Sequence, residues 1–204
     1  MSAHIIKFPL DFLIHAVYYL IQMYQKLTQL NVLSLFMDNP YEKYYLREAA
    51  RLLNMSPMTL KRSLELLLKS KLIQKEKIKN QILYSAKMQS PAFRHLKISR
   101  SLSWLEDKNL IEFLKKRIPG ISSIVLYGSY AKGEYDKKSD IDIMVISPAK
   151  KDLLPELDKL LGKEVNISVF SAAEWNRQAK ANRAFYLDVI TEGIVLYGTR
   201  PVVE

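Results

Sequence analysis

The segments Tyr127-Gly128-Ser129-Tyr130-Ala131-Lys132-Gly133 and Ser139-Asp140-Ile141-Asp142 lie five residues apart, and runs of β-forming residues flank them. The run Ile121–Tyr127 leads into the Gly-Ser pair, and Ile143–Ile146 follows the second aspartate. The segment Ser139–Ile146 alternates and then becomes wholly apolar, which is typical of a buried strand. The pattern therefore predicts two successive strands, with Gly-Ser at the end of the first. The charged loop between the segments, Glu134–Lys138, is expected to be mobile.

Asp140 and Asp142 fall on one face of the second strand, because side chains alternate along a strand. The two residues are about 7 Å apart along the chain. Carboxylates this close repel each other unless a cation neutralises them. Oxygen ligands favour Mg²⁺ or Mn²⁺, so the pair predicts a site for one of these divalent ions.

The Gly-Ser pair is suited to bind the phosphates of a ligand beside such a metal ion. Gly128 lets the backbone approach a ligand closely. The hydroxyl of Ser129 and the nearby amides can hold phosphate oxygens at a helix start. Metal ions that bridge those phosphates would orient an in-line attack. An Asp-x-Asp pair alone is most often a pair of surface charges, but an Asp-x-Asp pair that follows a strand and a Gly-Ser turn is far more specific.

These motifs together resemble the signature of the DNA polymerase β-like nucleotidyltransferase superfamily, and they are most similar to those of the minimal nucleotidyltransferases. The resemblance implies that Gly128 and Ser129 bind the triphosphate of a nucleotide. It also implies that Asp140 and Asp142 are the metal ligands. Lys132 stands where the family often has a basic residue, so it is expected to touch phosphate; a solvated loop lysine is the alternative.

The family usually supplies a third carboxylate from a later strand, where it helps to bind the catalytic metal and deprotonates the attacking hydroxyl. In the matching segment, Lys163–Phe170, that position holds Asn166. Asparagine can ligate through its carbonyl but cannot act as a base, and losing a general base typically costs ~10²–10⁴-fold in rate. Glu164 lies on the same strand face and is a substitute displaced by about 7 Å. The resemblance thus predicts nucleotide binding and leaves turnover open.

The resemblance covers residues 119–198 and implies the fold of the C-terminal part. Helices are expected at Asp152–Leu161, Ala172–Lys180 and Arg183–Thr191, and a closing strand at Gly193–Gly198. Residues 119–204 are therefore expected to form an α/β nucleotidyltransferase domain, with a small mixed sheet flanked by helices.

Residues 28–90 show the element order of a winged helix-turn-helix. Helical patterns are followed by a basic hairpin, in the order Thr28–Met37, Arg47–Leu53, Ser56–Ser70, Leu72–Ile78 and Gln81–Ala86. The third of these helices has a serine cap and a proline at its first position. The segment Leu46–Ile73 resembles the helix-turn-helix of archaeal and bacterial winged-helix regulators. The whole chain is therefore expected to be an α+β protein of two domains, of which the N-terminal one is mostly helical.

Double-stranded DNA is the partner that a winged helix predicts, because the second helix of the pair lies in the major groove of such complexes. Residues 1–118 contain 20 Lys or Arg and 9 Asp or Glu, whereas residues 119–204 contain 11 and 12. An excess of positive charge in one half suits a polyanion. The helix of the pair that would enter the groove is Ser56–Ser70. The candidate contacts are outward-facing residues near the start of this helix and lysines of the hairpin: Ser56, Met58, Thr59, Lys61, Arg62, Lys75, Lys77 and Lys79. A winged helix used only for dimerisation is the alternative.

Two further segments complete the expected organisation. Residues 1–27 are predicted to form a helix that packs on the body or on a second subunit. Because they include Lys7 and Asp11, they lack the ~18 uncharged apolar residues that a membrane span needs. A start at Met23 would place most of this segment outside the native protein. Residues 91–118 are predicted to be a helical connector with a face that suits a homodimer.

The composition excludes several kinds of site. Cysteine is absent, which excludes disulfides, thiolate zinc sites and cysteine nucleophiles. A cysteine-free chain suits the reducing cytoplasm. The three histidines are scattered and form no ligand set.

Three functions remain open on the sequence. The first is an enzyme that transfers a nucleoside monophosphate from a nucleoside triphosphate to a hydroxyl. Small relatives of this kind often pair with a HEPN-type protein, as antitoxins that modify a toxin tyrosine. The second is a DNA-binding regulator whose nucleotidyltransferase domain binds nucleotide with weak or no turnover, which Asn166 and the basic half favour. The third is a structural dimer, which gives no reason for the aspartate pair. We expect a winged helix fused to a nucleotidyltransferase domain.

Overall fold

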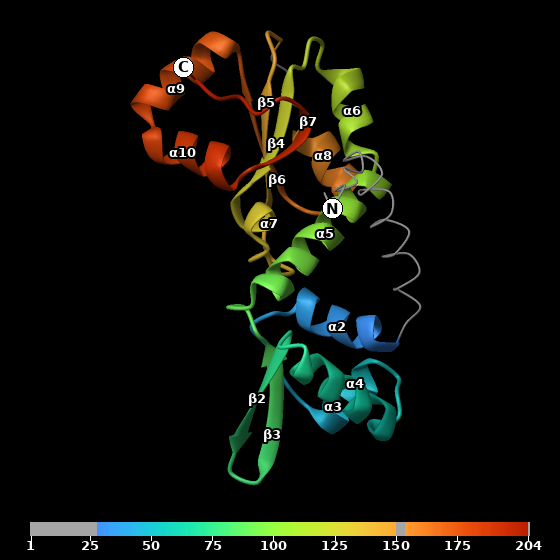
Figure 1. The fold of residues 1–204 in the computed structure, drawn as a ribbon. Coiled ribbons are helices and arrows are strands. Elements are labelled where there is room, and N and C mark those ends of the chain that lie inside the picture. Colours follow the sequence, from blue (N-terminus) through green and yellow to red (C-terminus); the bar gives the residue numbers. More distant parts are fainter. Residues whose placement is uncertain (1–27, 150–153, 204) are drawn as a thin grey trace, which may run out of the picture. The chain divides into compact units, whose positions relative to one another are not determined.

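The computed structural model describes residues 28–149 and 154–203 (Figure 1). The helix expected at residues 1–27 lies outside the described residues. The chain divides into two compact units, Met1–Lys87 and Met88–Glu204. Within the described part of the chain, no helix combines the length and the apolar character needed to cross a bilayer.

The first unit consists of helices and a small antiparallel sheet of order β1-β3-β2. Its elements are α2 (Thr28–Asp38), β1 (Lys43–Tyr45), α3 (Leu46–Leu52), α4 (Pro57–Lys69), β2 (Ile73–Ile78) and β3 (Gln81–Ala86). The side chain of Ser56 accepts a hydrogen bond from the Thr59 amide at 3.1 Å and so caps α4, as the sequence predicts. These elements agree with the expected ones to within a residue at each end, but the assignment as a winged helix remains a prediction.

The second unit is built on a mixed sheet of order β6-β5-β4-β7. Its strands are β4 (Ser123–Tyr127), β5 (Ile141–Ile146), β6 (Val165–Phe170) and β7 (Ile194–Gly198). Strand β4 pairs antiparallel with both β5 and β7, whereas β5 and β6 are parallel. A parallel pair needs a crossover connection, and α8 (Leu154–Leu161) lies in this one. The mixed sheet with flanking helices agrees with the expected nucleotidyltransferase fold.

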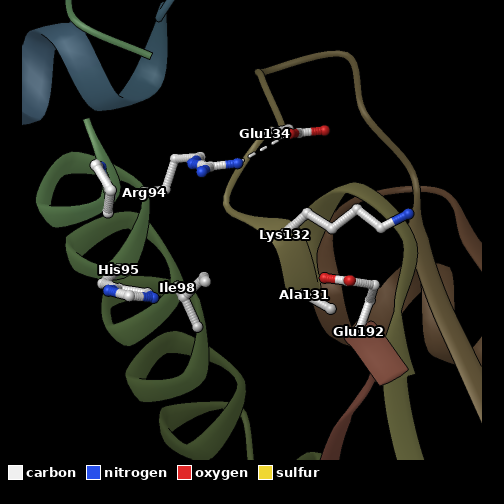
Figure 2. A pocket seen from close by; sticks show the side chains of 8 residues that line it. Arg94, His95, Ile98, Ala131, Lys132, Glu134 and Glu192 are labelled. Atoms are coloured by element: carbon white, nitrogen blue, oxygen red, sulfur yellow. Dashed lines mark hydrogen bonds and ion pairs between the residues drawn. The ribbon is translucent and has the colours of Figure 1, made fainter. Parts of the chain in front are cut away.

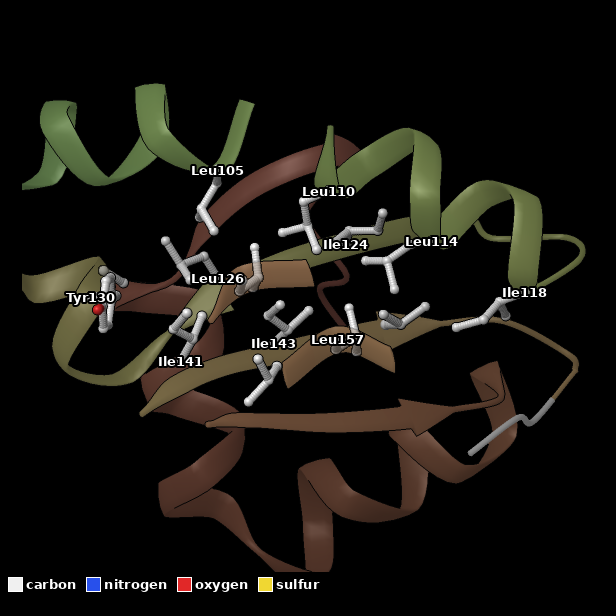
Figure 3. Packing of buried hydrophobic residues seen from close by; sticks show 14 residues of the cluster. Leu105, Leu110, Leu114, Ile118, Ile124, Leu126, Tyr130, Ile141, Ile143 and Leu157 are labelled. Atoms are coloured by element: carbon white, nitrogen blue, oxygen red, sulfur yellow. The ribbon is translucent and has the colours of Figure 1, made fainter. Parts of the chain in front are cut away.

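Helices cover both faces of this sheet, which is why its central strands are apolar at successive positions. The covering helices are α5 (Pro91–Asp107), α6 (Leu110–Arg117), α7 (Gly128–Lys132), α8, α9 (Ala172–Ala181), α10 (Arg183–Leu187) and the π-helical turn η1 (Asp188–Glu192). Ile124 and Leu126 of β4 pack in a cluster with residues of α5, α6 and α8 (Figure 3). Val125 packs on the opposite face, in a cluster with residues of α9, α10 and η1. Alternate positions of one strand therefore contribute to two cores.

Residues 91–118, expected to be a connector, belong to the second unit. Their apolar side chains are buried against the sheet: Leu105, Leu110, Leu114 and Ile118 are each at most 3% exposed (Figure 3). The face proposed for a homodimer is therefore largely occupied within the chain. Leu96 is 39% exposed, while its neighbour Lys97 is 0% exposed.

Candidate active site

The Gly-Ser turn begins where β4 ends, and its geometry explains the glycine. Gly128 has φ +68°, in the left-handed region that favours glycine. A Cβ at this position would lie 2.1 Å from Oδ2 of Asp142. Tyr127 and Asp142 are paired in the β4–β5 register, so the turn and the second aspartate lie directly beside each other. The two motifs of the sequence thus form one site.

Asn166 lies on the neighbouring strand β6 and contacts both aspartates. It is paired with Asp142 in the parallel β5–β6 register. Its side-chain Nδ2 donates a hydrogen bond to Oδ2 of Asp140 at 2.5 Å and another to Oδ1 of Asp142 at 3.2 Å. The amide group therefore offsets part of the repulsion between the carboxylates. Glu164 is exposed and lies just before β6, two residues from Asn166.

The environment of Asp142 disfavours its negative charge. Burial raises the pKa of the Asp142 carboxyl most strongly, and the charges of Asp140 and Asp188 raise it further. The hydrogen bond from Asn166 and the charge of Lys132 act in the opposite direction. A cation placed between the carboxylates would relieve this unfavourable charge.

The polar groups of the site could hold a divalent ion together with a phosphate group. Within residues 28–149 and 154–203, no three side chains of His, Cys, Asp or Glu gather into a metal cluster. Mg²⁺ is commonly bound by one or two carboxylates together with substrate phosphates, so Asp140 and Asp142 suit an ion that arrives with a nucleotide. Ser129 Oγ is buried and has no hydrogen-bond partner among the described residues. Such a hydroxyl is available to a ligand.

Comparisons with known proteins agree with this geometry. Residues 107–188 match the model of the nucleotidyltransferase domain family. MJ0604 of Methanocaldococcus jannaschii, a protein named as a putative protein adenylyltransferase, is 40% identical over 100 residues, which are 45% of this chain and 98% of that protein. The chain belongs to the nucleotidyltransferase family.

Further relatives of this family member carry related names. MntA of Shewanella oneidensis, named a protein adenylyltransferase, is 28% identical over 96 residues, or 47% of this chain and 68% of MntA. A crystal structure described as a toxin–antitoxin with AMP-PNP is 31% identical, with a TM-score of 0.38, over 47% of this chain and 74% of that one. The matches to MJ0604 and MntA each cover less than half of this chain.

Substitution of Gly128 by alanine tests the close approach of the turn to Asp142. The alanine Cβ would displace the Asp142 carboxylate, so we expect a loss of folding stability and of nucleotide binding. Gly162→Ala is the matched control, because Gly162 has φ +64° and no atom within 4 Å of an added Cβ. Backbone strain alone should cost the control about 1–2 kcal/mol. Thermal unfolding and nucleotide titration of both variants check this; equal effects in the two would contradict the clash.

Lys132 makes an ion pair that the sequence did not predict. Its Nζ lies 2.5 Å from Oδ1 of Asp188, which belongs to η1. This bond raises the pKa of Lys132. The only sequence signal for Asp188 is a single acidic residue inside the apolar run Leu187–Ile190, 56 residues beyond Lys132. The ion pair with Asp188 therefore fixes the Lys132 side chain, so Lys132 is not a freely solvated loop lysine.

A groove of about 450 Å³ borders the same lysine (Figure 2). It lies between α5 on one side and α7 with η1 on the other, and its lining residues are Pro91, Arg94, His95, Ile98, Ala131, Lys132, Glu134 and Glu192. Arg94 reaches the loop after α7, where it pairs with Glu134 at 3.5 Å (Figure 2). The Gly-Ser turn at the start of α7 is thus flanked by α5 as well as by the sheet.

The residues expected to contact DNA all belong to the first unit and are all exposed. Ser56 precedes α4, and Met58, Thr59, Lys61 and Arg62 lie in its first half. The hairpin lysines are also exposed: Lys75 and Lys77 on β2, and Lys79 in the turn to β3. Their exposure leaves them available to a partner, and DNA contact remains a prediction.

Proposed function

We propose that this protein is a metal-dependent nucleotidyltransferase that moves a nucleoside monophosphate from a nucleoside triphosphate to a hydroxyl of a protein. The observation that supports this most is the joint placement of Gly128, Ser129, Asp140 and Asp142 at one end of the sheet. The names of MJ0604 and MntA, both given as protein adenylyltransferases, support a protein acceptor. A HEPN-type partner protein is the acceptor that the family resemblance suggests.

Each residue has a definite task in this proposal. Asp140 and Asp142 would hold Mg²⁺ or Mn²⁺, which would neutralise charge on the phosphates. Gly128 lets the triphosphate approach the backbone, and the Ser129 hydroxyl donates to a phosphate oxygen. Lys132 offsets negative charge on the leaving pyrophosphate.

The two sides of the aspartate pair differ in chemistry. Lys132 of α7 and its partner Asp188 of η1 lie on the β4 side of Asp142. Asn166 comes from β6, on the other side. We assign the triphosphate to the lysine side and the acceptor hydroxyl to the asparagine side. Asn166 can orient that hydroxyl by a hydrogen bond but cannot take its proton. The hydroxyl proton would therefore pass to water or to a group of the acceptor, and turnover is expected to be slow.

Label transfer is the direct test. The purified protein is incubated with Mg²⁺ or Mn²⁺, each α-labelled nucleoside triphosphate in turn, and host lysate as a source of acceptors. The double variant Asp140→Ala, Asp142→Ala is the control. Labelling of a protein band by the wild type alone would support the proposal and identify the acceptor. Labelling retained in the double variant would refute it.

A second candidate function is DNA binding by the first unit, which the exposed basic residues of α4 and the hairpin support. Phosphate contacts release counterions, so the affinity for duplex DNA should fall steeply with salt, with a slope of about −0.9 per phosphate contact on logarithmic axes. We expect the double variant Lys61→Ala, Arg62→Ala to weaken binding at least about tenfold and to reduce the slope by about two. Gel-shift titrations at several salt concentrations measure both quantities. Lys116→Ala, in the second unit, is the control; unchanged affinity in the double variant would exclude α4 as the contact.

A further inference from the structure

Lys97 of α5 is a wholly buried lysine that the proposed chemistry does not use. It is 0% exposed. Its Nζ donates a hydrogen bond to the backbone carbonyl of Tyr135 and lies 4.2 Å from the centre of the Tyr135 ring. In return, the Tyr135 hydroxyl donates to the backbone carbonyl of Lys97 at 2.9 Å. A buried ammonium group is costly unless polar groups surround it, so this lysine is tied to the position of Tyr135.

Tyr135 connects Lys97 to the phosphate-binding turn. Its ring is stacked on that of Tyr130, with ring centres 4.1 Å apart and planes 7° apart. Tyr130 is 2% exposed and directly follows Ser129. Burial raises the pKa of Tyr130 to about 12, so its phenol stays neutral and adds no negative charge beside the aspartates. A displacement of Tyr135 would therefore remove the support under the residue next to Ser129.

The same loop leads into the aspartate strand on its other side. Ser139, the residue before Asp140, donates through its hydroxyl to Asp136 Oδ1 at 3.0 Å and accepts from the Asp136 amide at 2.9 Å. The amide of Lys138 donates to the same carboxylate oxygen at 2.8 Å. The hydrogen bond from the Lys138 amide lowers the pKa of Asp136 most, and the charge of Lys97 lowers it further. The turn that delivers Asp140 is thus stabilised from within and lies next to the Lys97–Tyr135 contact.

Helix α5 supports the start of the loop in a second place. A Cβ on Gly133 would lie 2.5 Å from the backbone carbonyl oxygen of Arg94, so the loop backbone is pressed against the helix. The Arg94–Glu134 pair spans the same junction (Figure 2). The loop expected from its charges to be mobile is therefore fixed to α5 over residues 133–135.

We propose that Lys97 is a positioning residue of the nucleotidyltransferase site. It fixes the loop between α7 and β5, and through that loop the spacing between the Ser129 turn and the Asp140–Asp142 pair. The inference rests on the proposed function for its effect on nucleotide, while its effect on the loop is independent of any activity. Without the lysine charge the loop loses its contact with α5 at Tyr135, and the phosphate-binding and metal-binding halves of the site lose their fixed separation.

The test compares three variants with the wild type. Lys97→Met keeps an unbranched stem of similar length and removes the charge, whereas Lys97→Arg keeps the charge. Lys116→Met removes an exposed lysine from α6 of the same unit and is the control. Hydrogen exchange of residues 133–139 is measured without nucleotide, and ATP affinity and transfer rate are measured over a range of Mg²⁺ concentrations. Thermal unfolding gives the folded fraction, to which all values are normalised.

We expect Lys97→Met to speed exchange of the loop amides about tenfold and to weaken ATP affinity about tenfold per folded molecule. Lys97→Arg should recover part of both effects, and Lys116→Met should resemble the wild type. Unchanged loop exchange in Lys97→Met would overturn the proposal. Faster loop exchange with normal ATP affinity and transfer would also overturn it, because Lys97 would then stabilise the fold alone. Failure of the wild type to bind ATP or transfer its nucleotide would count against the proposed function, and loop exchange would then decide whether Lys97 fixes the loop.

Discussion

Asp142→Asn is expected to lower the rate of nucleotidyl transfer by about 10³-fold, equivalent to about 4 kcal/mol of transition-state stabilisation. The change is isosteric but removes one of the two carboxylates that hold the metal. The Asn166 amide can still donate to the new side-chain carbonyl, so the local hydrogen bond is kept. Steady-state transfer rates at saturating nucleotide, measured across a range of Mg²⁺ concentrations, check the prediction.

The same variant should be at least as stable as the wild type when metal is absent. The pKa of Asp142 is raised in the folded protein, so the folded state binds this proton more tightly than the unfolded state does. The ionised carboxylate therefore destabilises the fold near neutral pH, and wild-type stability should rise as the pH falls toward the raised pKa. Asp142→Asn should lack that rise. Thermal unfolding in chelator over a range of pH separates this outcome from a folding defect, which would lower stability together with activity.

Glu164→Gln is the matched control for the metal site, because Glu164 is an exposed carboxylate two residues before Asn166. If Asp140 and Asp142 are the ligands, this variant should transfer at nearly the wild-type rate. A loss comparable to that of Asp142→Asn would instead make Glu164 the substitute for the absent third carboxylate.

Asn166→Asp is expected to raise the transfer rate by about 10²-fold, at the lower end of what a general base contributes. The new carboxylate would face Asp140 and Asp142 and could accept the proton of the attacking hydroxyl. It would also strengthen metal binding, so the Mg²⁺ concentration for half-maximal rate should fall. Initial rates as a function of pH and Mg²⁺ measure both effects.

Gain of activity in Asn166→Asp should be accompanied by lower stability without metal. The substitution removes two hydrogen bonds to the aspartates and adds a third like charge. Added Mg²⁺ should therefore stabilise this variant more than the wild type. Asn166→Ala is the control, since it loses the hydrogen bonds but gains no charge. If both variants transfer at the wild-type rate, Asn166 does not face the acceptor.

The parts of the site that were predictable from the sequence are those whose signals are local. The two-residue period of a strand is enough to place Asp140 and Asp142 on one face, and the apolar run before Gly128 marks the turn. The cap at Ser56 and the proline after it mark the start of α4 in the same way. Each of these inferences depends on residues within a few positions of one another.

The parts that were not predictable depend on contacts between distant segments. Asp188 reaches Lys132 across 56 residues, and a lone acidic residue in an apolar run does not indicate its partner. The burial of Lys97 was not predicted, because a lysine beside an apolar residue such as Leu96 is ordinarily the exposed one of the two. The carbonyl of Tyr135, 38 residues away, provides the acceptor that permits a lysine to be buried instead. The same contact fixes a loop whose composition suggests mobility.

The position of β7 near the end of the described chain affects how long β4 stays unpaired during synthesis. Strand β7 pairs with β4 on the side opposite β5, and the residues after it are held by bonds such as that from Trp175 Nε1 to the carbonyl of Pro201 at 2.7 Å. Until residues 194–198 have left the ribosome, β4 has one unpaired edge, and such edges promote aggregation. The Gly-Ser turn at the end of β4 is therefore synthesised well before its strand gains protection on both sides, and nascent chains are exposed to self-association during that interval.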